Sequence, residues 1–423
     1  MKHSLLISLG LVAAPPLAAA QPAPTPSDPA PAAAPADHLS SAPADGSPPP
    51  APQPLTALPR ESAIENAIGR AAIAGSAIGG YGELTYNNRS DADAVIDMRR
   101  FVLFFGHDFN EHLRFYSEVE VEHAIASADD AGEIEIEQAY LDGLFSKRLN
   151  LRGGVIVMPM GIINVYHEPP SFNGVDRPDV DELVIPSTWR EPGFGIFGEL
   201  TEGLRYQLYL VNGFNANGFT AEAAIQHGHQ EAQLANGGDF GVIGRLDYEP
   251  VLGTVFGVSA YGGTSGNTLR DTVGRVPIAM FDVDARYRHK GFSARGELAV
   301  LMVGDTEALN TALAGGTPDQ QAAGPVAARS QGGYLELAYD TMRLLAPSSD
   351  QGLDVFTRFD YADTQANVLG GVAALPELKR ESLMVGLVYR PIPQIGLKLD
   401  YRRHFVTDAS SFNELATAIT WLF

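Results

Sequence analysis

The chain of 423 residues contains no cysteine and few basic residues. Without cysteine there is no disulfide framework, no thiolate nucleophile and no zinc–thiolate site. Lysine and arginine number 29 against 51 aspartate and glutamate residues, and the formal net charge is −22. Nucleic-acid binding depends on neutralising phosphates with basic side chains. We therefore expect no nucleic-acid partner.

Long hydrophobic runs are also absent from the greater part of the chain. After the first 20 residues, no run reaches the roughly 18 consecutive apolar residues that a membrane-spanning helix needs. This absence leaves a transmembrane β-barrel open, because the strands of such barrels give a much weaker signal per segment.

The first residues have the composition of an export signal. Lys2 is followed by an apolar stretch at 5–14 and by small residues that end at Ala20, which is typical of a secretory signal peptide. The following segment is rich in proline and alanine and predicts a disordered linker or tail. The predicted divisions are a signal peptide at 1–20, a disordered segment at 21–60, a short helix at 61–76 and a barrel domain at 77–423.

From Ala77 onwards the pattern changes to alternation of apolar and polar residues. The stretch from Phe281 to Arg288 alternates without a break, which predicts strands with one apolar and one polar face. Most of the segments have the roughly 9–11 residues that a tilted strand needs to cross a bilayer. We predict sixteen strands, at 77–86, 95–106, 112–123, 133–144, 149–157, 192–200, 203–212, 239–249, 253–263, 277–289, 291–303, 331–343, 352–361, 380–391, 395–406 and 410–423.

The connections between these strands alternate in length. Most odd-numbered connections are long and most even-numbered ones are tight turns, which is the asymmetry of bacterial outer-membrane barrels. The longest connection, Met158–Glu191, is rich in proline and mixes aromatic, acidic and basic residues. A loop of this length inside a compact domain is normally functional or disordered. Its composition favours a functional loop.

The predicted fold class is all-β, an antiparallel transmembrane β-barrel of about 16 strands. Backbone groups in lipid must all be paired, so the sheet must close. A closed sheet of this size is too wide for its own side chains to fill, which predicts an aqueous channel lined by the polar face. We predict that the pore wall and its constriction carry Arg114, Arg152, Arg205, Arg245, Arg286, Arg358, Arg402, Glu168, Asp176, Arg177, Asp179, Asp181 and Glu182.

Three features resemble a known family of channels. Arg99-Arg100 opens the second predicted strand, EIEIEQAYLDGLF forms the fourth, and LRGGVIVMPMG leads into the long loop. Residues 77–423 resemble the bacterial outer-membrane porins. The three motifs are similar to sequences of the phosphate-selective porin O and P family. The resemblance implies a loop folded into the barrel to narrow it, and a homotrimer. That subfamily carries a dense ladder of arginine and lysine, whereas this chain has few lysines and an acidic excess.

The chain ends on a predicted strand with Trp421 and Phe423 facing outward. These terminal aromatic residues resemble the signal that the barrel-assembly machinery reads on outer-membrane barrels. We therefore expect export through the periplasm to the outer membrane, with membrane lipid around the apolar face.

The function predicted from the sequence is passive diffusion of small hydrophilic solutes and ions. An anion- or phosphate-selective channel is the alternative within transport, and an outer-membrane enzyme or an adhesin are rivals from other classes. No spacing of serine and histidine singles out a catalytic triad, so no enzymatic activity is predicted. His227 and His229 lack a third ligand nearby, and neither a metal nor a cofactor is predicted.

Overall fold

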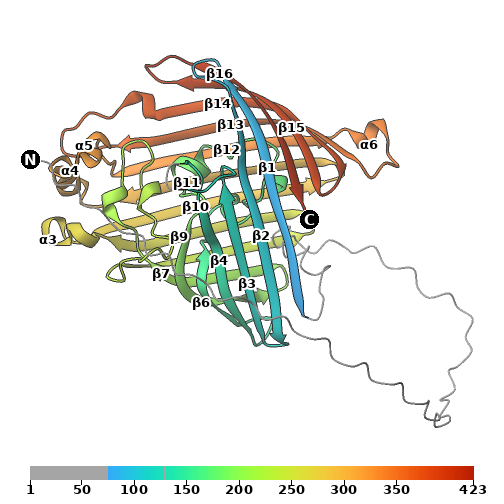
Figure 1. Ribbon diagram of the computed structural model, residues 1–423, viewed down its shortest axis with the longest axis horizontal. Helices are drawn as coiled ribbons and strands as arrows, with labels where there is room; N and C mark the ends of the chain where they lie inside the picture. Colours follow the sequence, from blue (N-terminus) through green and yellow to red (C-terminus); the bar gives the residue numbers. More distant parts are fainter. Residues whose placement is uncertain (1–74, 128–129) are drawn as a thin grey trace, which may run out of the picture. The chain divides into compact units, whose positions relative to one another are not determined.

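The computed structural model describes residues 75–127 and 130–423, all within one compact unit. The predicted signal peptide, the Pro/Ala-rich segment and residues 61–74 of the predicted helix lie outside the described residues. Ser76, which the sequence assigns to the end of that helix, is the first residue of β1. The predicted barrel is confirmed: sixteen antiparallel strands pair in sequence order and close on themselves (Figure 1).

The strands are β1 (Ser76–Arg89), β2 (Val95–Asn110), β3 (Leu113–Glu122), β4 (Ile134–Leu144), β5 (Asn150–Val157), β6 (Arg190–Thr201), β7 (Leu204–Asn212), β8 (Phe240–Val251), β9 (Thr254–Ser265), β10 (Val276–His289), β11 (Phe292–Val303), β12 (Arg329–Asp340), β13 (Gly352–Asn367), β14 (Lys379–Ile392), β15 (Ile395–Val406) and β16 (Phe412–Leu422). The connections carry the short helices η1 (Pro169–Ser171), α2 (Val180–Leu183), η2 (Ala216–Gly218), η3 (Gln226–Gly228), η4 (Asn267–Leu269), α3 (Arg270–Val273), α4 (Thr306–Ala314), α5 (Pro318–Ala322), α6 (Met342–Leu345) and η5 (Pro376–Leu378).

All sixteen predicted strands are present, and most boundaries agree to about three residues. The largest difference is at β13, which continues to Asn367 instead of ending at 361. The extension follows from its neighbour, because Arg329 at the start of β12 pairs with Asn367 and continues the ladder beyond the expected end. The predicted long loop ends earlier than expected, since Arg190 and Glu191 already belong to β6.

The barrel closes where β1 meets β16. The register runs from Tyr81 opposite Leu422 to Arg89 opposite Glu414. At Gly82 the chain passes close to its neighbours: a Cβ atom there would lie 2.7 Å from the Trp421 ring and 2.8 Å from the Arg100 carbonyl oxygen. Glycine therefore allows the indole of the last strand to lie close to the backbone of the first strand.

Each strand has an outer apolar face and an inner face that is mostly polar. On β15, Leu397, Leu399 and Tyr401 are 41–45% exposed on the outside, whereas the intervening Lys398 and Asp400 are 3% and 1% exposed. Side chains that line an open bore would be exposed to water, whereas these inner polar side chains are buried. Another part of the chain must therefore lie inside the barrel and cover them.

The inner face is not polar everywhere, which differs from the prediction. On β8–β11 the inward positions include Ile243, Tyr261, Met280 and Leu301, all at most 2% exposed. These strands have apolar residues on both faces, as strands buried on both sides do. Alternation alone does not reveal what covers the second face.

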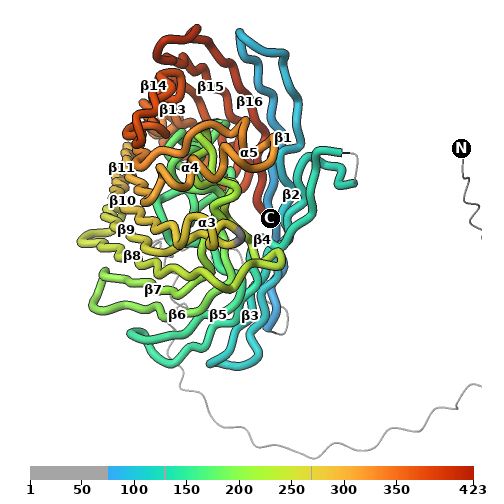
Figure 2. Tube along the Cα trace, turned by 90° about the vertical axis from the view of Figure 1, so that its left-hand side faces the viewer, coloured from blue at the N-terminus to red at the C-terminus, as the bar shows by residue number. Residues whose placement is uncertain are grey.

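The two rims of the barrel differ as predicted. Tight turns join most of the strands at one rim, and the exception is the connection between β12 and β13, which carries α6. In the turn between β10 and β11, Lys290 and Gly291 both have positive φ, 48° and 87°, as a two-residue type I′ hairpin requires. The long connections lie at the other rim, where Figure 1 shows α3, α4 and α5, and Figure 2 looks toward this end. No helix among the described residues is long and apolar enough to cross a membrane.

A substitution on the apolar outer face tests whether this face contacts membrane lipid. We expect Leu399→Arg, on the outside of β15, to lower the free energy of unfolding by about 2–4 kcal/mol, because a charged side chain would be placed in hydrocarbon. Urea unfolding of the barrel in lipid vesicles measures the change.

The matched control is Leu345→Arg in α6, which is 72% exposed and belongs to the connection between β12 and β13. It should cost about 1 kcal/mol or less. Equal destabilisation by the two changes would contradict the assignment of the outer face to lipid.

Candidate functional site

The loop of residues 158–189, called here the long loop, joins β5 to β6 and carries η1 and α2. Its two ends are held together. The Met158 amide donates to the Trp189 carbonyl at 2.9 Å. The Asn164 side chain donates to both the Met158 and Trp189 carbonyls, at 2.8 and 3.0 Å, and accepts from the Trp189 amide at 2.7 Å. This polar clasp makes the loop a closed excursion of the chain.

Polar side chains on the barrel wall bind the backbone of the long loop. These side chains lie on strands distant from β5 and β6, which the loop connects. The Ile162 amide donates to the Glu297 carboxylate on β11 at 3.0 Å, and the Val175 amide donates to Asp400 on β15 at 2.7 Å. Lys398 on β15 donates to the Gly174 carbonyl at 2.8 Å. A loop without regular structure must find partners for its buried backbone groups. Here the inner faces of β11 and β15 provide them.

Buried arginines on β13 and β15 continue this anchoring. Arg358 on β13 donates to the carbonyls of Asp176 and Arg177, both at 3.1 Å, and pairs with Asp360 at 2.9 Å. Arg402 on β15 pairs with Asp179 of the loop at 3.0 Å. Planar guanidinium groups suit such multiple hydrogen bonds. These charges therefore position the loop within the barrel's inner surface.

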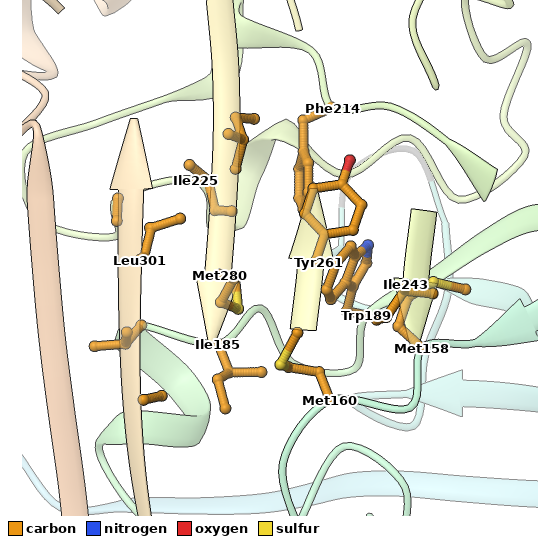
Figure 3. Close-up of a cluster of buried hydrophobic side chains, with 14 of the residues drawn as sticks. Met158, Met160, Ile185, Trp189, Phe214, Ile225, Ile243, Tyr261, Met280 and Leu301 are labelled. Atoms are coloured by element: carbon orange, nitrogen blue, oxygen red, sulfur yellow. The ribbon is translucent and has the colours of Figure 1, made fainter. Parts of the chain in front are cut away.

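The other side of the long loop is apolar and packs on β8–β11. Figure 3 shows Met158, Met160, Ile185 and Trp189 against inward side chains of these strands. The Trp189 ring lies 5.1 Å from Tyr261 and 4.9 Å from Phe214, between ring centroids. Trp189 is fully buried. The loop thus covers the apolar inner face that the strand pattern left unexplained.

A cavity of about 370 Å³ remains between the loop and the first two strands. The loop side chains at this cavity include Asp176, Arg177 and Glu182. Asp176 pairs with Arg99 on β2 at 2.8 Å. Arg177 donates to the hydroxyl groups of Ser187 and Thr188. Among the described residues, no carboxylate forms an ion pair with Arg177. The lining is Glu83, Arg99, Arg100, Phe172, Asp176, Arg177, Glu182, Ser187 and Gln226.

A second cavity, of about 660 Å³, adjoins the first and shares Asp176 and Glu182 with it. Asp179 and Arg402 also line it, together with residues at the long-loop rim such as Glu377. We call this second cavity the outer cavity and the 370 Å³ cavity the middle cavity. The acidic side chains of Asp176 and Glu182 therefore line both the middle and the outer cavity.

A third cavity, of about 350 Å³, is lined from the opposite side of the loop and shares no residue with the middle cavity. Three predicted site residues, Arg152, Arg205 and Glu168, line this inner cavity. Arg152 pairs with Asp142 at 2.8 Å and lies over the Tyr140 ring, 4.0 Å from its centroid. The predicted residues are therefore distributed over three spaces.

The remaining predicted wall arginines lie elsewhere. Arg245 is buried, pairs with Asp284 at 2.7 Å and donates to the Gly161 carbonyl at 3.1 Å. Arg286 lies over the Tyr166 ring, 4.7 Å from its centroid. Both hold the first half of the long loop. Arg114 is about half exposed and pairs with Asp108 at 2.6 Å near a tight turn, away from the loop.

Asp181 and Glu182 are neighbours with different surroundings. Asp181 is fully buried and lines none of the three cavities; burial, and then the Asp282 carboxylate, raise its pKa well above the usual value. Glu182 faces open space, yet enclosure within the barrel, and then Asp176 and Asp179, raise its pKa to about 7. Glu182 is therefore a carboxyl group that changes charge near neutral pH.

Several lining residues were not among those predicted. Glu83 and Arg100 stand opposite each other in the β1–β2 register and form an ion pair at 3.1 Å. A cross-strand register built on the predicted hairpin could have paired them. Gln226 carries no such signal. It reaches the site from the loop between β7 and β8, where it exchanges hydrogen bonds with the backbone of Ser187 at 2.9 and 2.7 Å.

Comparison with known proteins gives one curated relative. An uncharacterized protein of Aquifex aeolicus is 36% identical over 354 residues, which are 82% of this chain and 80% of that protein. No protein-family model matches the chain.

Solved structures share the fold at low sequence identity. The chain is similar to OmpF of Salmonella typhi, solved in complex with daunomycin, with a TM-score of 0.56 and 15% identity over 82% of this chain and 97% of that one. It is also similar to the outer-membrane channel DcaP of Acinetobacter baumannii (TM-score 0.53, 11% identity, 84% and 99%) and to the anion-selective porin from Comamonas acidovorans (0.51, 10%, 82% and 99%). These neighbours are channels and porins rather than enzymes, and at such identities the likeness shows the fold.

The anchoring arginines lead to a prediction about the loop. Arg358→Met should leave the Asp176 and Arg177 carbonyls without their donor and the buried Asp360 with Arg402 as its remaining cation, which we expect to cost about 3 kcal/mol. Limited proteolysis should then cut within residues 170–185. Gel analysis of the fragments and urea unfolding measure the two effects.

Arg114→Met is the control, because it removes a half-exposed ion pair distant from the loop. Its cost should be about 1 kcal/mol or less, and the loop should stay resistant to protease. Full resistance in Arg358→Met would show that this arginine does not hold the loop.

Proposed function

This chain belongs to the same family as the Aquifex aeolicus protein and has the fold of the outer-membrane porins, and we propose that it forms a water-filled channel through the outer membrane. Small hydrophilic solutes and ions would cross it by passive diffusion. The observation that carries the proposal is the combination of a closed barrel, an apolar outer face and charged cavities against the long loop. On the same grounds, we assign the constriction of the channel to the long loop.

The charges in the middle cavity support a preference for polar and zwitterionic solutes. Three arginines and three carboxylates line it, and two of the arginines are paired, Arg100 with Glu83 and Arg99 with Asp176. Arg177 and Glu182 remain to meet a solute with charges of opposite sign. Rings of charged side chains set selectivity in such channels.

Anion selectivity, the property named for the Comamonas acidovorans porin, is the second candidate. The arginines of the middle cavity favour it, but equal numbers of arginine and carboxylate side chains give that cavity no excess of positive charge. Phosphate selectivity is supported still less, because only one lysine, Lys147, lines any of the three cavities described above.

The cellular setting follows from the same features. We propose residence in the outer membrane, with lipid against the apolar outer face and folding by the barrel-assembly machinery. A homotrimer is proposed from the resemblance to porins. The sequence singles out no nucleophile and base for an enzymatic role, and an adhesin would leave the charged interior without a role.

Shortening the constriction should widen the channel. Deletion of residues 170–185 removes the loop's charged tip and keeps both the clasp at Asn164 and the apolar base at Trp189. We expect higher single-channel conductance in a planar bilayer, because a wider aqueous path carries more ions.

Deletion of residues 370–374, an exposed part of the connection between β13 and β14, is the control and should leave conductance unchanged. An unchanged conductance after the 170–185 deletion, in a protein that still assembles as a barrel, would place the long loop outside the conducting path.

Glu182 predicts a pH-dependent selectivity. Its pKa is raised to about 7, so it is neutral at about pH 5.5 and anionic at about pH 8.5. The charged groups that face it are Asp176, Asp179, Arg177 and Arg402. Cation preference should therefore increase as the pH rises through about 7, measured as the reversal potential in a salt gradient.

The variant Glu182→Gln should remove this increase. Its reversal potential should stay, at every pH, near the value that the original protein has at low pH. Glu377→Gln removes the same charge from the outer cavity and serves as the control, with the pH dependence retained. A pH-dependent reversal potential that persists in Glu182→Gln would assign the titration to another group.

A further inference from the structure

The inner face of β3 and β4 carries more acidic side chains than the function described above uses. Glu118, Glu120 and Glu122 alternate along β3, and Glu135 and Glu137 lie on the facing part of β4. Glu118, Glu120 and Glu137 are at most 2% exposed. Buried carboxylates are normally paired with cations or bind metal ions. The partners of this set therefore need to be identified.

A β-bulge changes the direction of one of these side chains. In the β3–β4 register Glu118 stands opposite Gln138, and the next residue, Val119, stands opposite Ile136, so Glu137 is the extra residue. Strict alternation would turn adjacent side chains to opposite faces. Because of the bulge, Glu137 is fully buried while its neighbour Gln138 donates to Glu118 at 2.7 Å. Both side chains thus converge on Glu118.

His167 of the long loop completes this group. Its Nε2 atom lies 3.1 Å from Glu137 Oε1 and 3.9 Å from Glu118 Oε2. Its Nδ1 atom lies 3.1 Å from the Asn164 carbonyl oxygen, which accepts a hydrogen bond from it. This hydrogen bond orients the ring so that Nε2 faces the two carboxylates. His167 is 2% exposed, so bulk water does not reach the group freely.

The surrounding charges do not balance. Six carboxylates, Glu83, Glu118, Glu120, Glu122, Glu135 and Glu137, lie together along β1, β3 and β4. The cations that pair with them among the described residues are Arg100 and Arg190, with His167 as a third when it is protonated. In these ion pairs the carboxylates outnumber the positive charges, and Arg190 is also shared with Glu231. A bound cation would add positive charge beside the buried Glu118 and Glu137.

The three donor atoms have the separation that a metal ion requires. Glu118, Glu137 and His167 each offer one ligand atom, and these atoms lie within 4.8 Å of one another. A tetrahedral ion with bonds of about 2.0–2.1 Å needs donors about 3.3 Å apart. The two measured distances from His167 Nε2 lie on either side of this value, 3.1 and 3.9 Å. Binding of such an ion would draw Glu118 Oε2, now 3.9 Å from His167 Nε2, closer to the other two donors.

The hydrogen bonds around the donors also fit a metal site. Glu137 Oε1 and His167 Nε2 are buried and face each other at 3.1 Å, and no other described residue forms a hydrogen bond with either atom. The other Glu137 oxygen accepts from the Tyr81 hydroxyl at 3.2 Å, and the other Glu118 oxygen accepts from the Tyr116 hydroxyl. Outer hydrogen bonds of this kind orient metal-binding carboxylates.

We propose that Glu118, Glu137 and His167 form a binding site for a divalent transition-metal ion, with Zn²⁺ as the representative ligand. One imidazole and two carboxylates suit zinc, whereas calcium and magnesium favour sites made of oxygen alone. Three protein ligands leave a fourth position for water.

The place of this site gives it a consequence for the channel, and this part rests on the proposed function. Arg100, which pairs with Glu83 and Glu120, lines the middle cavity, while Glu118 and His167 line the inner cavity. The site therefore lies in the wall of the inner cavity, and Arg100 of the middle cavity contacts the same acidic group through Glu120. A metal ion there would fasten the long loop to β3 and β4 and hold this part of the path narrow.

Metal binding is tested on purified, folded protein in detergent after removal of metal with a chelator. Titration with zinc chloride, followed by desalting and elemental analysis, should give one Zn²⁺ ion per chain. His167→Ala and Glu137→Gln should each weaken zinc binding at least about tenfold. The second variant keeps the size of the side chain, so it remains informative if the first does not fold.

His112→Ala is the matched control, because His112 is exposed beside Glu111, with 3.5 Å between the imidazole and the carboxylate. Its zinc binding should equal that of the original protein. Absence of bound zinc in the original protein, or equal binding in His167→Ala, would overturn the site and leave an ion pair between His167 and Glu137. This measurement needs no channel activity, so its failure is distinct from failure of the proposed function.

The consequence for the channel is measured separately in planar bilayers. Zinc should lower the single-channel conductance of the original protein and have no effect on His167→Ala. A conductance that zinc does not change, in protein that binds zinc, would separate the site from the conducting path.

Discussion

The requirement that every backbone amide and carbonyl find a partner governs this structure on both sides of the barrel wall. On the outside, hydrocarbon offers no hydrogen bonds, so an open sheet edge would leave a row of unpaired groups. The pairing of β1 with β16 removes that edge. The closed ring then fixes which residues face inward, because side chains alternate along each strand. Closure thus creates the interior in which every other feature lies.

The same requirement acts inside the barrel on the long loop. The loop has only short helices, so part of its backbone takes hydrogen-bond partners outside the loop. Wall side chains such as Lys398, Asp400 and Arg358 supply them. In return, the loop's carbonyls and carboxylates stabilise charges that would be costly to bury alone. The wall and the loop therefore depend on each other, which explains why wall charges are covered instead of lining an open bore.

The loop divides the interior into two regions of different character. Its apolar residues, with Trp189 at the centre, pack against β8–β11 and fill that side of the barrel (Figure 3). Its charged residues face β1, β2 and β15, where the middle and outer cavities remain. The middle and outer cavities therefore lie on the charged side of the loop, and Asp176 and Glu182 line both of them.

The sequence alone determined the barrel, its sixteen strands, the alternation of its faces and the position of the long loop. These features are local: alternation along a strand and the length of a connection can be read from neighbouring residues. It also indicated the chemistry of the interior, since Asp176, Arg177 and Glu182 were among the predicted residues and lie at one cavity. Only the tertiary structure decided which charges lie open and which are buried anchors. Arg358 and Arg152 look alike in the strand pattern, yet Arg358 holds the loop and Arg152 lines a cavity. The difference depends on the path of the loop, which brings His167 to Glu137 and Gln226 to Ser187 across the barrel, and such long-range contacts leave no periodic signal in the chain.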